Sequence, residues 1–183
     1  MTQTSPPEAP LVETEAGLKP DGEGCFVVNV SESVARASED AGHAWPFEDP
    51  AHRFPHFGLN VHVLQPGEPA CKYHAEEAQE GFLVLQGECV LVVGDEERRL
   101  RQWDLFHAPP WTPHVLIGAV TGPCAVLMVG ARFSQKGIIY PVSEVAARYG
   151  ASVEAETSSP REAYAGWQPP LPARRTWPPE GAM

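Results

Sequence analysis

A series of short apolar segments separated by turn residues runs from residue 57 to residue 132, and it limits the fold more than any other feature. Phe57–Leu64 alternates apolar and other residues, with Val61 and Val63 on the apolar face, as a strand with one buried side does. This pattern predicts an all-β domain over residues 57–132, built as an antiparallel sandwich or barrel. Similar segments follow about every ten residues with Gly, Pro or Asp turns between them: Cys71–Glu76, Glu80–Leu85, Cys89–Val93, Arg98–Arg101, Asp104–Ala108, Pro113–Val120 and Pro123–Arg132.

The sequence before this domain has a different texture. Residues 1–23 are rich in Pro, Glu, Thr and Gly, and their acidic side chains outnumber a single lysine. Such a composition predicts a solvated, poorly ordered tail. Gly24–Val30 is rich in β-branched residues and is followed by Ser, so it is predicted to be the first strand of a segment, 24–56, that is otherwise irregular.

After the domain the pattern becomes helical. Ser143 is placed to cap a helix over residues 144–150, and Ser159 followed by Pro160 predicts a second short helix. Residues 133–167 are therefore expected to form a C-terminal helical extension. Residues 168–183 are Pro-rich with neither helical nor strand period, which predicts a flexible tail.

The charge balance argues against a nucleic-acid partner. The net charge is −11, lysine occurs three times, and no basic stripe is present to replace counterions on phosphates. No segment approaches the roughly 18 apolar residues of a membrane span. The first residues lack the basic and apolar regions of a secretory signal, so a cytoplasmic location is expected.

The four cysteines are far apart and form no CxxC pair. In a reducing compartment they are expected to be buried thiols that behave as small hydrophobic residues. Cys71 differs because it precedes His74 by three residues and is close enough in sequence to face the same cavity.

A histidine and three carboxylates lie within seven residues, directly before the apolar run that begins at Phe82. Alternate residues of a strand share a face, so His74 and Glu76 are expected to point the same way. Glu80 begins the next strand and can return to the same cavity, and His114 follows a stiff Pro-rich turn. Two imidazoles and two carboxylates predict a site for a divalent transition metal, whether Fe, Mn, Ni, Co, Zn or Cu. Without a cation, burying both carboxylates would cost several kcal/mol each.

The neighbouring residues leave alternatives open. Glu76 is a ligand, a partner of a ligand or a solvated turn residue, and Gln79 is a neutral substitute for it. Glu77 is expected to face solvent. His62 is out of phase with the apolar face of its strand, which predicts a solvent or interface position. His107 faces either the cavity or the outer surface, and Trp111 is a candidate residue for the cavity rim.

The segment from His74 to Gly87 and the segment from Trp103 to Gly118 resemble the two motifs of the cupin superfamily. The first motif, G-x5-H-x-H-x3,4-E-x6-G, fits with His74, Glu80 and Gly87 in place, while Glu76 stands at its second histidine. The second motif, G-x5-P-x-G-x2-H-x3-N, fits at Pro109 and His114. Its two glycines are replaced and its asparagine is Gly118; the residues at the glycine positions are Trp103 and Trp111.

The resemblance implies an antiparallel jelly-roll β-barrel with short C-terminal helices and flexible tails. It implies metal ligands at His74, Glu80 and His114, with Glu76 in place of the fourth, and a homodimer as the assembly.

Two classes of function are consistent with such a site. The first is a metal-dependent enzyme on a small molecule, either a dioxygenase or an isomerase or lyase in which Glu76 is the general base. The alternative is a non-catalytic module that binds or senses a metal or small ligand. A barrel without metal is disfavoured, because every candidate ligand position keeps a coordinating side chain.

Overall fold

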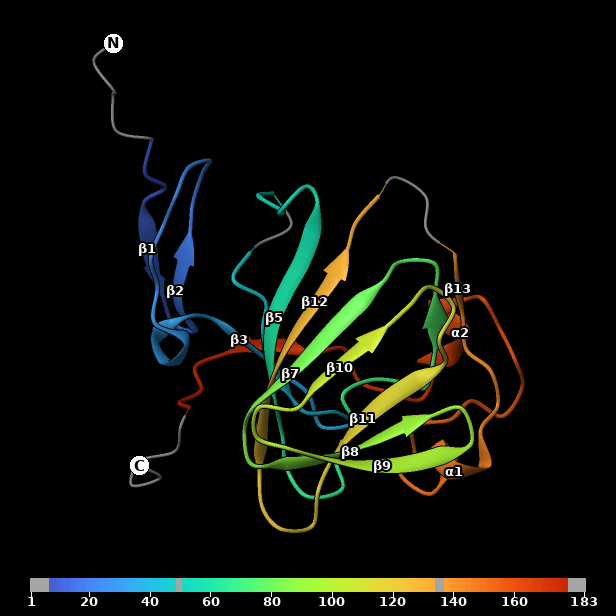
Figure 1. The fold of residues 1–183 in the computed structure, drawn as a ribbon. Helices are drawn as coiled ribbons and strands as arrows, with labels where there is room; N and C mark the ends of the chain where they lie inside the picture. Colours follow the sequence, from blue (N-terminus) through green and yellow to red (C-terminus); the bar gives the residue numbers. More distant parts are fainter. Residues whose placement is uncertain (1–6, 49–50, 134–136, 178–183) are drawn as a thin grey trace.

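The computed structural model describes residues 7–48, 51–133 and 137–177, and it shows an all-β architecture, as predicted (Figure 1). The larger of its two main sheets is antiparallel throughout and has seven strands. In spatial order these are β10 (Leu105–Ala108), β7 (Glu80–Gln86), β12 (Cys124–Ala131), β5 (Phe57–Leu64), β4 (His43–Trp45), β3 (Ala35–Ala37) and β14 (Leu171–Ala173).

The second layer is a three-stranded sheet of β11 (His114–Gly118), β8 (Glu88–Val93) and β9 (Glu96–Arg101). A two-stranded ladder of β6 (Ala75–Glu76) and β13 (Ile138–Ile139) continues this layer through a bridge between His74 and His114. The sheets are not joined into one continuous hydrogen-bonded barrel within the described ranges.

Apolar side chains from both layers meet between them and form the main core. Its buried members come from six strands and the segment before β6, and include Leu64, Phe82, Val84, Leu91, Leu116 and Val126. Strand β5 is buried on both sides, because Val61 and Val63 pack on the outer face of the large sheet against Trp45. The alternation in β5 therefore marks the outer face, and the opposite face lines the interior.

Two short helices follow the domain, as predicted. Helix α1 (Glu144–Ala147) begins after Ser143, whose hydroxyl accepts a hydrogen bond from the Ala146 amide, and it packs on the outer face of β8 and β11. Helix α2 (Pro160–Ala163) begins after Ser159. Among the described residues, neither helix nor any other is long and apolar enough to span a membrane.

Both terminal segments differ from the prediction. Within the predicted tail, the described residues 7–23 are partly regular, because β1 (Leu11–Thr14) and β2 (Gly17–Pro20) form a hairpin, at the left of Figure 1. The predicted strand at 24–30 is wrong: it has one isolated bridge, from Cys25 to Glu8, and continues into the 3-10 turn η1 (Val30–Glu32).

At the other end, Leu171–Ala173 pairs with β3 although the segment is Pro-rich. Strand β14 is the edge strand of its sheet, and an edge position tolerates the missing amide of Pro172. Within the predicted strand Cys71–Glu76 the regular part is restricted to β6. Residues 178–183 of the predicted tail lie outside the described ranges.

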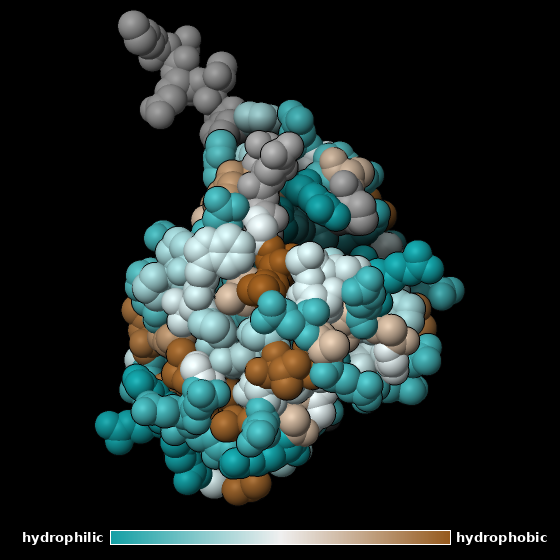
Figure 2. Space-filling model, turned by 90° about the vertical axis from the view of Figure 1, so that its right-hand side faces the viewer, coloured by the Kyte–Doolittle hydropathy of each residue, from teal (hydrophilic) through white to brown (hydrophobic). Residues whose placement is uncertain are grey.

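Figure 2 shows the face at the right of Figure 1, on the side of α1 and α2. Hydrophobic residues on this face form small separate patches among hydrophilic ones. Single exposed apolar side chains of this kind are ordinary on a protein surface.

Two glycines that flank β8 test how closely the layers approach. Both have left-handed backbones, with φ of 73° at Gly87 and 57° at Gly94. A Cβ at Gly87 would lie 2.4 Å from the Pro123 carbonyl oxygen, whereas a Cβ at Gly94 would meet nothing within 4 Å.

We expect Gly87→Ala to lower the free energy of unfolding by about 1–3 kcal/mol more than Gly94→Ala, because only the first adds a backbone clash to the left-handed strain. Urea unfolding followed by circular dichroism measures both. Equal losses for the two variants would contradict the close approach at Gly87.

Candidate metal centre

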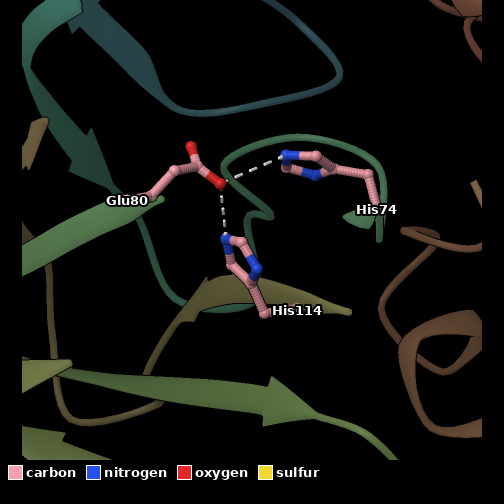
Figure 3. A group of neighbouring side chains, drawn as sticks. All are labelled: His74, Glu80 and His114. Carbon is pink, nitrogen blue, oxygen red and sulfur yellow. Dashed lines mark ion pairs between the residues drawn. The ribbon is translucent and has the colours of Figure 1, made fainter. Parts of the chain in front are cut away.

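Three side chains from separate strand ends converge between the layers (Figure 3). They are His74 before β6, Glu80 at the start of β7 and His114 at the start of β11. One Glu80 carboxylate oxygen lies 3.9 Å from His74 Nε2 and 3.5 Å from His114 Nε2. One ligand atom from each residue lies within 4.8 Å of the other two.

The backbone sets the relative position of the two histidines. The His74 amide donates to the His114 carbonyl at 3.2 Å, and the His114 amide donates to the His74 carbonyl at 2.9 Å. Their imidazole centroids are 5.1 Å apart. Because the two residues are direct partners across antiparallel chains, their side chains lie on the same face.

Hydrogen bonds also set the tautomer of each ring. Nδ1 of His74 lies 2.9 Å from the Lys72 carbonyl oxygen, and Nδ1 of His114 lies 2.9 Å from the Thr112 carbonyl oxygen. A carbonyl only accepts, so each Nδ1 carries the proton and each Nε2 presents a lone pair to the centre.

The His114 ring is held in its neutral form. Burial, followed by the neighbouring His74, lowers the pKa of His114 to about 4 although the Thr112 carbonyl opposes the shift, so the ring is neutral at pH 7. His114 Nε2 is buried without a hydrogen-bond partner among the described residues. Two imidazole nitrogens and a carboxylate oxygen that face one another can hold a cation, and His, His and Glu are suitable ligands for a divalent transition metal.

Aromatic rings pack against His114. Phe82 and Phe106 contact it edge-on, with ring centroids at 4.9 Å and 5.5 Å. These contacts fix the imidazole plane and exclude water from the side of His114 that they cover.

The three residues line a cavity of about 240 Å³ inside the domain. Glu76 is buried at 6% exposure and lines the same cavity, but it is not part of the group within 4.8 Å. A Cβ at Gly130 would lie 3.6 Å from Glu80 Oε1 and 3.9 Å from Glu76 Oε1, so both carboxylates lie against this glycine. Ligation by Glu76 and its role as a base stay predictions.

Several other residues that the sequence suggested as candidates do not line the cavity. Glu77 is exposed, as expected, and its carboxylate accepts from the Gly137 amide at 3.1 Å. Gln79 and His107 are also exposed, and neither lines the cavity. Trp111 is half-exposed and its amide donates to the Glu76 carbonyl at 2.7 Å, which joins the turn before His114 to β6.

The prediction for His62 is wrong, because its side chain lines the cavity. The inner face of β5 is made by alternate residues, Gly58, Asn60, His62 and Leu64. Burial lowers the pKa of His62 to about 4, and its Nδ1 has no partner among the described residues. The signal missed in the sequence was the pair of polar residues Asn60 and His62, which are two positions apart in β5 and therefore share its inner face.

Two other cavity residues were missed or left open. Arg132 lies at the end of β12, and its guanidinium donates to both Glu48 carboxylate oxygens and to the Phe54 carbonyl. This pair ties the segment before β5 to the cavity. Cys71 faces the cavity, and its sulfur lies 3.6 Å from His74 Nδ1.

Comparison with known proteins agrees with this geometry. Residues 60–130 match the sequence family of the cupin domain. The chain contains a cupin domain. No protein of curated function matches the chain by sequence.

Solved structures share the fold of the cupin domain at low identity. A sugar phosphate isomerase of the cupin superfamily from Silicibacter pomeroyi is 20% identical with a TM-score of 0.56, over 62% of this chain and 80% of that one. The polyketide cyclase RemF from Streptomyces resistomycificus is 18% identical with a TM-score of 0.51, over 58% and 79%.

A candidate sugar phosphate isomerase from Acidithiobacillus ferrooxidans is 24% identical with a TM-score of 0.45, over 47% of this chain. The chain spans 56% of the length of that protein. The isomerase from Silicibacter pomeroyi and the cyclase RemF, both with TM-scores above 0.5, show a shared fold alone.

We expect the double variant His74→Ala/His114→Ala to lose metal binding, because it removes two of three ligands. Wild type loaded in turn with Fe²⁺, Mn²⁺, Ni²⁺ and Zn²⁺ and then dialysed should retain about one ion per chain of at least one metal. Elemental analysis measures the ratio. His107→Ala is the matched control and should retain metal, and a wild type with only trace metal after every loading would exclude the site.

Proposed function

We propose that the chain is a metal-dependent enzyme that acts on a small molecule. The observation that carries this proposal is the convergence of two imidazole Nε2 atoms and one carboxylate oxygen at the edge of an internal cavity. Three protein ligands leave coordination positions for a substrate, whereas structural metal sites are usually fully closed by protein. A divalent metal held there would supply Lewis-acid chemistry and, if it is iron, redox chemistry.

Dioxygenase chemistry is the first reaction class that we propose. Two histidines and one carboxylate are the ligand set typical of non-haem iron oxygenases. The residues around the set suit that task, because Phe82 and Phe106 keep water from one side of His114. The cavity of about 240 Å³ has room for the reacting part of a small substrate.

An isomerase or lyase is the second class, and Glu76 favours it. This carboxylate is buried, lines the cavity and lies outside the group of three converging ligands. A carboxylate beside a Lewis-acidic centre can take a proton from carbon next to a polarised carbonyl and return it elsewhere. In this case Glu76 would hold the proton, and His74, Glu80 and His114 would hold the metal.

An open coordination position separates an enzyme from a closed metal-binding module. We expect Fe²⁺-loaded protein to bind nitric oxide and to give the electron paramagnetic resonance signal of a high-spin iron–nitrosyl, because three ligands leave positions free. Protein that retains iron but gives no such signal would favour the non-catalytic alternative. The His74→Ala/His114→Ala variant treated in the same way is the background control.

Glu76→Gln distinguishes the two reaction classes once a screen of small molecules identifies turnover. For an isomerase or lyase, we expect kcat to fall by about 10²- to 10⁴-fold with the metal content unchanged, because the general base is lost. For a dioxygenase, removal of O₂ should stop turnover. Glu77→Gln is the matched control, since Glu77 is exposed one residue away, and an equal loss in both variants would contradict the role of Glu76.

A further inference from the structure

A second and larger cavity adjoins the metal cavity. Its volume is about 690 Å³, and it shares three lining residues with the metal cavity: His62, Ala70 and Cys71. Much of its remaining lining comes from β3, β4 and the segment after α2, which lie outside the matched cupin residues 60–130. These additions to the cupin domain therefore border a space that adjoins the metal cavity.

The large sheet supplies the floor of this second cavity. His62 on β5 pairs with Ala44 on β4, and Ala44 pairs with Arg36 on β3. Direct cross-strand partners share a face, so these side chains form one row that starts at the metal cavity. With strands about 4.8 Å apart, the row places the Cα of Arg36 about 10 Å from that of His62. The small side chain of Ala44 leaves the space between them open.

The segment after α2 supplies the wall, and several contacts fix it. The Lys72 ammonium lies 4.4 Å from the centre of the Trp167 ring, and the Tyr164 ring packs against Trp167 at 5.3 Å. The Tyr164 hydroxyl accepts a hydrogen bond from the Lys72 amide at 3.1 Å. The Gln168 amide donates to Asp40 at 2.6 Å. The aromatic wall is thus tied to the residues that precede His74.

The charge of the lining is opposite to that of the whole chain. Arg36 and Arg161 line the cavity, and no carboxylate does, although the chain has 24 acidic residues and a net charge of −11. No described carboxylate forms an ion pair with either arginine. An arginine without an acidic partner in a largely apolar cavity is a suitable site for an anion.

The rest of the lining is mainly apolar. Ala41, Ala44, Ala70, Trp167 and two prolines offer few hydrogen-bond partners. A sugar in this space would bury several hydroxyl groups with few hydrogen-bond partners, which is unfavourable. An apolar body would lose no such bonds. Where the two cavities meet, the buried Nδ1 of His62 has no described partner and is available to a polar atom of a ligand.

We propose that the second cavity binds an anionic small molecule with an apolar body, whose anionic end contacts Arg36 and Arg161 while its other end reaches the metal centre. This inference rests on the proposed function, because it names the class of substrate for the same site.

Two probes of equal shape test the proposal on the full chain. They are 4-phenylbutanoate, which is anionic, and 4-phenylbutanamide, which is neutral. We expect wild type to bind the anion at least about tenfold more tightly than the amide, because bonds between an arginine and a carboxylate are charge-assisted. Isothermal titration calorimetry measures both affinities.

The variants assign that preference to the cavity. Arg36→Gln and Arg161→Gln should each reduce the preference, and the pair together should abolish it. Arg98→Gln is the matched control, since Arg98 is exposed on β9 and pairs with Glu96, and it should leave the preference unchanged. Trp167→Ala should weaken both probes equally. Circular dichroism checks folding, and Arg161 on the surface of α2 gives the second test if Arg36→Gln does not fold.

Equal affinity of wild type for the two probes, no binding of either, or an unchanged preference in Arg36→Gln/Arg161→Gln would overturn the inference. The His74→Ala/His114→Ala variant separates it from the metal proposal. That variant should keep the anion preference even without metal. Metal binding without any anion preference would contradict only the anion site in the second cavity. An anion preference without metal binding would contradict only the proposed function.

Discussion

Two imidazole nitrogens and a carboxylate oxygen face one another where the two sheets of the cupin domain meet. Their positions follow from backbone pairing, because His74 and His114 exchange amide hydrogen bonds across the join. Carbonyl acceptors on Nδ1 then orient both lone pairs toward Glu80. The buried Nε2 of His114 has no hydrogen-bond partner among the described residues, which is unfavourable, and metal binding would offset that cost. The surrounding aromatic and aliphatic core makes this dependence stronger, since water has little access to His114.

The segments outside the cupin domain extend this site instead of merely covering it. Strands β3 and β4 lengthen the sheet beyond β5, and β14 is added after the chain has crossed the molecule from α2. The result is a second cavity that a minimal pair of sheets would not enclose. Its arginines and its aromatic wall come from residues far apart in the sequence, Arg36 and Trp167 among them. In the proposed assignment, the residues that would select a substrate are thereby separated in the chain from those that would hold the metal.

Much of the fold and of the candidate site was predictable from local sequence, and the failures share a physical cause. Strand spacing, turn residues and helix caps act within about ten residues, so β5–β12 and both helices were found. His74, Glu80 and His114 follow from the motif spacing. Strand β14 depends on pairing with β3 over 130 residues away, which no local pattern specifies. His62 was misplaced because β5 is buried on both faces, so apolar alternation there marks the outer side.

The tryptophans at the two motif glycine positions keep the left-handed backbone conformation that glycine usually adopts there. Trp103 and Trp111 have φ of 73° and 64°, the left-handed region that glycine adopts readily and other residues adopt at a cost of about 1–2 kcal/mol. At Trp111 a packing contact offsets part of this strain. The indole ring packs so closely against Gly137 that a Cβ there would lie 2.6 Å from the ring. The same residue donates its amide to the Glu76 carbonyl. This hydrogen bond joins the turn before His114 to the strand that carries Glu76. Trp111, which replaces a motif glycine, therefore helps to set the position of the Glu76 carboxylate relative to the candidate ligands.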